Sequence, residues 1–90
     1  MTTAELPTID HPTGRDNFTR VDVGGVTFWF SYRTCVAFNR HDGTGPVVRE
    51  NDWGPTTGKH LNWIDDGDKG RRVPANVFQS ALSTVPDVTL

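Results

Sequence analysis

A glycine pair near the first third of the chain places the strongest constraint on its fold. Gly24 and Gly25 tolerate the positive φ angles of a two-residue β-hairpin turn. With these residues as the turn, the flanking segments pair as Val23–Val26, Val21–Phe28, Thr19–Phe30, Asp22–Thr27, Arg20–Trp29 and Phe18–Ser31. The side that carries Val21 is almost wholly apolar, and the side that carries Arg20 is mixed. Residues 17–31 are therefore predicted to form a half-buried antiparallel hairpin.

Two further segments after this hairpin have the character of strands. Residues 34–40 alternate in side-chain type around Val36 and Phe38. The connection before them lacks glycine and proline, so a second hairpin and a long bent strand with a bulge both remain open, and the register of this strand is unassigned. Asp42 and Gly43 are typical of a turn. Residues 46–50 then return as a short strand, with a proline at its first position.

The second half of the chain has helical patterns. Thr56 or Thr57 is placed to cap a short helix, which the acidic loop of residues 65–68 ends. Pro74 suits the first turn of a second helix. That helix has an apolar stripe formed by Val77, Phe78, Ala81, Leu82 and Val85.

This order of elements predicts an α+β fold, because consecutive strands are followed by helices. We expect a small antiparallel β-meander of three to four strands, packed by the short helix and the C-terminal amphipathic helix. Both helices are expected on one face of the sheet, with the C-terminal helix over the face that carries Val21 and Phe28. Residues 1–16 have few apolar groups and no periodicity, and are expected to form a disordered arm. The single domain then spans residues 17–85, and residues 86–90 form a tail.

Charge and cysteine content exclude several classes of protein. The formal net charge is −2 and the isoelectric point about 5.8, unlike the overall basic balance of a nonspecific nucleic-acid binder. Cys35 is the single cysteine, so no disulfide within the chain is possible and nothing indicates an oxidising compartment. No apolar run approaches the length of a membrane span. We expect a cytoplasmic protein without membrane association or cofactor.

The stretch W-G-P-T-T-G-K-H-L-N-W is the strongest candidate for a functional site. Its candidate binding residues are Trp53, Thr56, Thr57, Lys59, His60, Asn62 and Trp63, followed by Arg71 and Arg72, with Tyr32 and Arg33 as neighbours. The first turn of a helix presents N–H groups to a phosphate or carboxylate. Tryptophans can stack on a base or pack in a protein interface.

Two observations weigh against a recognition site in this stretch. A proline turn, a threonine cap and a solvated helix explain much of the pattern without any ligand. In addition, Asp65, Asp66 and Asp68 lie between the two basic clusters, and they would repel a phosphate backbone if they shared that face.

Catalysis and metal binding are less well supported. A threonine nucleophile with His60 as base would also need a group that orients the histidine and an oxyanion hole. We therefore assign no catalytic residue and do not expect an enzyme. His11 and His41 are far from His60 in the sequence, and one cysteine gives no paired-ligand spacing, so no metal site is expected. Cys35 lies within a strand and is expected to be a small buried residue.

Four short motifs resemble a known group of proteins. They are F-S-Y-x-T-x-V-A from Phe30 to Ala37, V-R-E-N-x-W from Val48 to Trp53, T-T-G-K-H-L-N from Thr56 to Asn62, and R-V-P from Arg72 to Pro74. Together they resemble small, mostly uncharacterised bacteriophage-encoded proteins. The resemblance spans roughly residues 26–78 and implies a phage or prophage accessory protein in the cytoplasm of a bacterial host cell. It implies no activity, so no residue role is carried over.

The leading hypothesis is a phage-encoded accessory binding protein that engages a host macromolecule without catalysis, and a host protein is the favoured partner. The alternative is a nucleic-acid-binding protein that uses Lys59, His60, Arg71, Arg72 and a tryptophan stack, whose binding would weaken steeply with salt. A small enzyme with threonine and histidine chemistry ranks third. Apolar side chains on the second sheet face, Phe18 and Trp29, leave a homodimer open.

Overall fold

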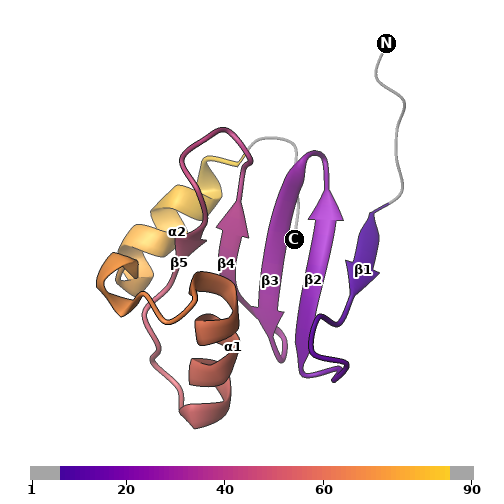
Figure 1. The fold of residues 1–90 in the computed structure, drawn as a ribbon. Helices are drawn as coiled ribbons and strands as arrows, with labels where there is room; N and C mark the ends of the chain where they lie inside the picture. Colours follow the sequence, from indigo (N-terminus) through magenta and orange to yellow (C-terminus); the bar gives the residue numbers. More distant parts are fainter. Residues whose placement is uncertain (1–6, 86–90) are drawn as a thin grey trace.

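The computed structural model describes residues 7–85, which form one antiparallel sheet and two α-helices. The sheet has five strands in sequence order (Figure 1). They are β1 (Thr8–Asp10), β2 (Phe18–Val23), β3 (Val26–Ser31), β4 (Thr34–Asn39) and β5 (Val47–Val48). The remaining elements are α1 (Pro55–Asp65), the 3₁₀-helix η1 (Lys69–Arg71) and α2 (Ala75–Ser83). The α+β class is confirmed, with five strands rather than the three to four expected.

The hairpin of β2 and β3 has the predicted register at every pair, from Val23 opposite Val26 to Phe18 opposite Ser31. Gly24 and Gly25 form the turn, with φ angles of 60° and 79°. Two consecutive residues with positive φ give the turn twist that matches a right-handed strand pair. The glycine pair therefore fixes which side chains of β2 and β3 share a face.

The segment with Cys35 forms a second hairpin that also contains a bulge. Tyr32 and Arg33 connect β3 to β4, and Tyr32 takes the left-handed conformation with φ 57°. The register then shifts between Trp29 and Phe30, because Trp29 pairs with Ala37 while Phe30 pairs with Cys35. Of the two structures left open by the sequence, the second hairpin is therefore the one that forms, and the bulge lies within it rather than in one long bent strand.

The segment of residues 7–16 contributes strand β1 to the sheet, so the prediction of a disordered arm is wrong for these residues. β1 pairs with β2 in antiparallel register. Arg20 donates two hydrogen bonds to the carboxylate of Asp10, at 3.0 and 2.6 Å, and His11 Nδ1 lies 3.2 Å from the carbonyl of Phe18. These long-range polar contacts hold a segment that has too few apolar residues to be recognised as a strand. Residues 1–6, and the predicted tail of residues 86–90, lie outside the described residues.

The two α-helices cover opposite faces of the sheet, which corrects the expectation of one shared face (Figure 1). As predicted, α2 packs through Phe78 on the face of Phe28 and Phe38. On the other face, α1 packs Leu61 among Phe18, Trp29, Val36, Ala37 and Val48. The mixed face is therefore a second core, and its apolar side chains are not available for the homodimer contact that the sequence left open.

The helix ends differ from the expected caps. Gly54 is the N-cap of α1 and Pro55 its first residue, so Thr56 and Thr57 lie inside the first turn and no side chain caps the helix. Proline at the first position needs no N–H partner there, which explains the shift. Asp66 ends α1 in the left-handed conformation, as the acidic loop predicted. Pro74 is the N-cap of α2 rather than a residue of its first turn.

Candidate functional site

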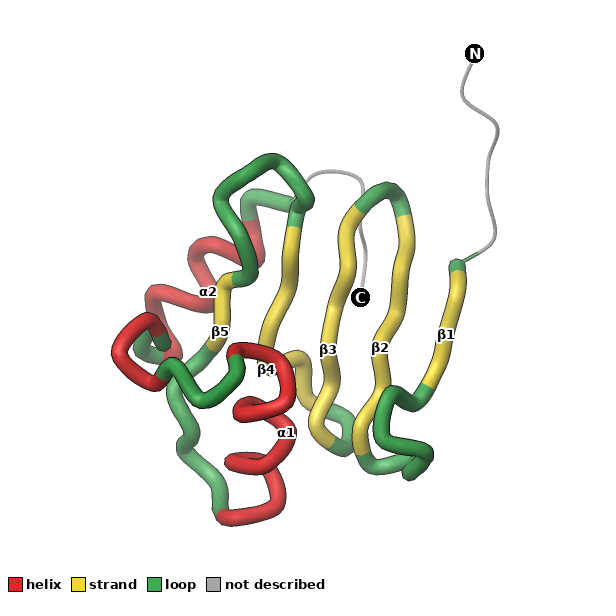
Figure 2. Tube along the Cα trace, viewed as in Figure 1, coloured by secondary structure: helices red, strands yellow, loops and turns green. Residues whose placement is uncertain are grey.

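A hollow of about 570 Å³ lies beside α1 at one end of the sheet. Its lining comes from three segments: the β1–β2 connection, the β3–β4 turn and α1. Figure 2 shows that the β1–β2 loop and the β3–β4 turn lie at the same end of the sheet, next to the start of α1. The lining residues are Thr13, Arg15, Asn17, Tyr32, Thr56, Lys59, His60 and Trp63.

One stripe of α1 supplies half of this lining. Thr56, Lys59, His60 and Trp63 are spaced by three or four residues, so their side chains project from one face of the helix. Four of the predicted binding residues, and the predicted neighbour Tyr32, are therefore brought together. Arg33, the other predicted neighbour, is exposed in the same turn but is not part of the lining.

Four aromatic rings pack against one another at this site. The rings of Phe18 and His60 are stacked, with centroids 4.7 Å apart and an interplanar angle of 6°. Trp63 meets Phe18 edge-on at 5.5 Å, and Tyr32 lies 6.2 Å from the His60 ring. Phe18 and His60 are buried, whereas Tyr32 and Trp63 are 57% and 47% exposed. A rigid buried pair thus supports two half-exposed rings.

His60 and Thr57 are held by one hydroxyl group of the sheet. Ser31 Oγ lies 2.7 Å from His60 Nδ1 and 2.9 Å from Thr57 Oγ1, and all three residues are buried. Burial lowers the pKa of His60 from its ordinary value, which favours the neutral ring. His60 and Thr57 therefore position α1, and the cationic groups of the hollow are Arg15 and Lys59.

This geometry does not resemble a nucleophilic catalytic site. A hydroxyl group rather than a carboxylate contacts His60 Nδ1, so the third member of a triad is missing at that position. The Ser31 hydroxyl is itself buried. Cys35 is no better as a nucleophile, because desolvation by burial raises the pKa of its thiol to about 11.

Trp53 lies outside the hollow. The guanidinium of Arg49 sits 4.5 Å from the centroid of the Trp53 ring and also donates to Asp52 at 3.0 Å. Trp53 is 46% exposed, nearly the same as Trp63. The two tryptophans that bracket the motif therefore do not form a common stack, because α1 begins after the first and carries the second near its end.

The second basic cluster is also separate from the hollow. Arg72 donates to both carboxylate oxygens of Asp65, at 2.7 and 3.0 Å, and to Asn62 Oδ1 at 2.9 Å. Both charged side chains of this pair are almost wholly buried. Burial alone would raise the pKa of Asp65, but the hydrogen bonds and charge of Arg72 lower it below its ordinary value. Arg71 is exposed on η1.

The sequence did not identify Thr13, Arg15 and Asn17 as site residues, because Thr13 and Arg15 lie in the segment interpreted as a disordered arm and Asn17 is the first residue of the predicted hairpin. Within residues 7–85, Asn17 Oδ1 is buried and has no hydrogen-bond partner. The backbone of Asn17 is fixed by the Tyr32 amide, which donates to the Asn17 carbonyl at 2.7 Å. The turn signal Pro12–Thr13–Gly14 was the available indication of local order.

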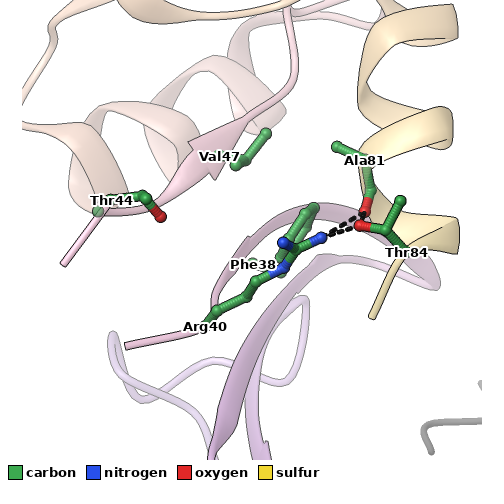
Figure 3. A pocket seen from close by; sticks show the side chains of 7 residues that line it. Phe38, Arg40, Thr44, Val47, Ala81 and Thr84 are labelled. Atoms are coloured by element: carbon green, nitrogen blue, oxygen red, sulfur yellow. Dashed lines mark hydrogen bonds between the residues drawn. The ribbon is translucent and has the colours of Figure 1, made fainter. Parts of the chain in front are cut away.

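Other polar clusters have structural explanations. In a hollow of about 270 Å³ between the sheet and α2 (Figure 3), Arg40 Nη2 donates to the carbonyl of Ala81 at 3.1 Å and to Thr84 Oγ1. The Arg40 guanidinium therefore satisfies a backbone carbonyl at the C-terminal end of α2, where a positive charge is favourable.

Near the first hairpin turn, the Thr27 hydroxyl contacts Asp22 and lies 2.8 Å from His41 Nε2. Here the hydroxyl lies between the other two groups, unlike a catalytic triad, in which histidine is central.

Searches for two special kinds of site give negative results over the described part of the chain. Residues 7–85 hold no cluster of three or more His, Cys, Asp or Glu side chains arranged for a metal ion. In the same span, neither α1 nor α2 combines the length and the apolar surface that crossing a membrane would take.

Comparison with known proteins gives one match. Residues 10–80 match a family model described as "Family of unknown function (DUF8033)". The matched range includes the hollow, the whole of α1 and the first part of α2. No curated protein and no solved structure matches the chain.

Proposed function

The chain belongs to the DUF8033 family of unknown function, and from this premise we propose that it is a non-catalytic binding protein whose site is the hollow beside α1. The ligand is an anionic segment of a partner macromolecule. The resemblance of its motifs to small bacteriophage-encoded proteins supports an accessory role in a bacterial host cell, with a host macromolecule as the partner.

The charge of the lining carries this proposal. Arg15 and Lys59 both line the hollow, and none of the lining residues identified in the described chain is acidic. The whole chain has a net charge of −2, so a locally cationic hollow is not a consequence of overall composition. Such a local field selects an anionic ligand and limits binding to one place on the surface.

The fixed geometry of the hollow also supports binding. The stacked Phe18 and His60 rings and the Ser31 hydrogen bonds hold α1, which carries Trp63, in place next to Tyr32. Tyrosine, tryptophan and arginine on a rigid support are the side chains that contribute most binding energy at interfaces. Within the described chain, the Ser31, Thr57 and His60 cluster is buried and serves to position α1, which favours binding over catalysis by these groups.

A pair of charge-reversed variants tests this function. Arg15→Glu/Lys59→Glu changes the hollow, and Lys69→Glu/Arg71→Glu makes the same change in net charge at two exposed residues of η1. Binding to two anionic polymers, polyglutamate and a single-stranded oligonucleotide, is measured by isothermal titration calorimetry. The proposal predicts that at least one polymer binds the unmodified protein. The hollow variant should bind that polymer about tenfold more weakly or worse, since each charge-assisted contact contributes roughly 1.5 kcal/mol.

The η1 variant should retain binding close to that of the unmodified protein. Equal losses in the two variants would mean that overall charge, not the hollow, governs binding. No binding of either polymer to the unmodified protein would also contradict the proposal.

A further inference from the structure

We infer that the ligand of the hollow is single-stranded nucleic acid, an inference that rests on the proposed function and names its ligand class. In this arrangement, bases stack on Tyr32 and Trp63 while backbone phosphates contact Arg15 and Lys59. Base stacking on aromatic side chains next to cationic groups is the common mode of single-strand binding.

The two half-exposed rings are the first argument. Tyr32 and Trp63 come from different elements, and each packs on one member of the buried Phe18–His60 stack. Each ring thus contacts one buried ring, while 57% of Tyr32 and 47% of Trp63 remain exposed. Rings fixed in this way lose little conformational entropy when a planar group stacks on them. Bases inside a duplex are already stacked on one another, so only unpaired bases can reach these rings.

The polar groups of the hollow are the second argument. Asn17 lines the hollow, and a side-chain amide there can donate hydrogen bonds to a ligand and accept them. The edges of unpaired nucleobases carry both N–H donors and acceptors that can pair with such an amide. The Thr13 and Thr56 hydroxyls, also in the lining, can donate to phosphate oxygens.

The number of charges is the third argument. Arg15 and Lys59 provide two cationic contacts, which suit a short segment of backbone. Single-stranded binding that neutralises two phosphates should give a slope of log K against log salt of about −1.4. A basic surface that binds long duplex DNA would give a much steeper slope.

The experiment distinguishes the contribution of the bases to affinity from that of the sugar–phosphate backbone. Fluorescence anisotropy is measured with a labelled oligothymidine of about 12 nucleotides, within the range bound by single-strand domains, and with an abasic oligomer of equal length and charge. We expect the oligothymidine to bind at least about tenfold more tightly than the abasic oligomer. We expect Trp63→Ala to weaken oligothymidine binding by about 5- to 150-fold and to leave abasic binding nearly unchanged.

Two further variants keep this test decisive. Trp53→Ala removes a tryptophan of matching exposure outside the hollow and should change neither affinity. Because Trp63 packs on Phe18, each variant is first checked for folding by thermal unfolding. If Trp63→Ala does not fold, Tyr32→Ala, which removes an exposed turn side chain, takes its place with the same expectation.

The outcomes distinguish the two proposals. Equal affinity for the abasic oligomer and the oligothymidine, or tighter binding of polyglutamate or of duplex DNA, would overturn the nucleic-acid inference. In those cases, sensitivity to Arg15→Glu/Lys59→Glu would still support an anion-binding hollow. If none of these polymers binds, both the inference and the proposed function fail.

Discussion

A hydrogen bond of 2.7 Å between Ser31 Oγ and His60 Nδ1 joins the end of β3 to the middle of α1. The same hydroxyl also contacts Thr57, one turn earlier on α1, at 2.9 Å. One buried hydroxyl group therefore fixes the rotation of the helix that supplies half of the lining of the hollow. The shape of the hollow depends on this contact as much as on the residues exposed in it.

Replacing Ser31 with alanine should lower the stability of the domain by about 1–3 kcal/mol. The reason is that the variant removes the partner of two buried polar groups, and an unsatisfied buried group costs that amount. Urea unfolding followed by circular dichroism measures the effect. Ser80→Ala, at an exposed position of α2, is the matched control and should change stability by less than about 0.5 kcal/mol. Equal midpoints for the two variants would contradict the role assigned to Ser31.

Stability should depend on the ionisation of His60. The pKa of His60 is lowered in the folded state by burial, so the unfolded chain binds a proton at higher pH than the folded chain does. The resulting stabilisation is fully present above the unfolded pKa of about 6.5 and is lost as the pH falls through the folded pKa. Urea midpoints measured from neutral to mildly acidic pH should therefore decrease. The decrease should be smaller in His60→Gln than in the unmodified protein, and an equal decrease in the two would argue against this assignment.

Removing Arg72 should be far more damaging than removing an exposed arginine. Arg72→Met leaves the nearly buried Asp65 carboxylate without its partner, which costs roughly 3–5 kcal/mol. Arg71→Met, one residue earlier and exposed, should have little effect. The double variant Asp65→Leu/Arg72→Met should recover much of the loss, because no unpaired buried charge remains. Thermal unfolding checks all of these variants, and additive losses in the double variant would refute the buried-pair explanation.

An acidic residue on the α2 face of the sheet should unfold the domain. Phe28 is fully buried beneath α2, and an unpaired charge there costs several kcal/mol, comparable to the whole stability of a small domain. Phe28→Asp should therefore give an unfolded circular dichroism spectrum. Val77→Asp, on α2 but 46% exposed, should remain folded. A folded, soluble Phe28→Asp protein would show that the core has been assigned to the wrong face.

The sequence predicted local structure well wherever a short pattern determined it. The glycine pair and the alternation around it were enough for every pair of the first hairpin. The apolar stripe of the last helix predicted the core position of Phe78, although Val77 at its margin is exposed. In both cases, the residues that determine the structure are close together in the chain.

Features that depend on distant contacts were predicted less well. Phe18 and Trp29 were interpreted as spare apolar surface, because nothing near them in sequence shows that Leu61 covers them. β1 was missed since its pairing relies on the Asp10–Arg20 contact rather than on its own apolar residues. Arg15, which lies in the same misinterpreted segment, was consequently absent from the predicted site.

For the site itself, the segment that lines the hollow was easier to predict than the role of each of its residues. The α1 motif does line the hollow through Lys59 and Trp63, but His60 and Thr57 are buried anchors. Arg72, expected to bind a ligand, is paired with Asp65. A charged or polar side chain in a motif becomes available to a ligand only if no partner elsewhere in the chain uses it.

The central claim is that the hollow beside α1, and no other aromatic surface of the described chain, receives the ligand. Trp63 in the hollow and Trp53 outside it are almost equally exposed, so their indole N–H signals can be compared in one ¹H–¹⁵N spectrum. On addition of single-stranded oligothymidine, we predict that the Trp63 indole signal and the backbone amide signals of Tyr32 and Lys59 shift. The Trp53 indole signal should not shift. A shift of Trp53 with a stationary Trp63 signal would contradict the account.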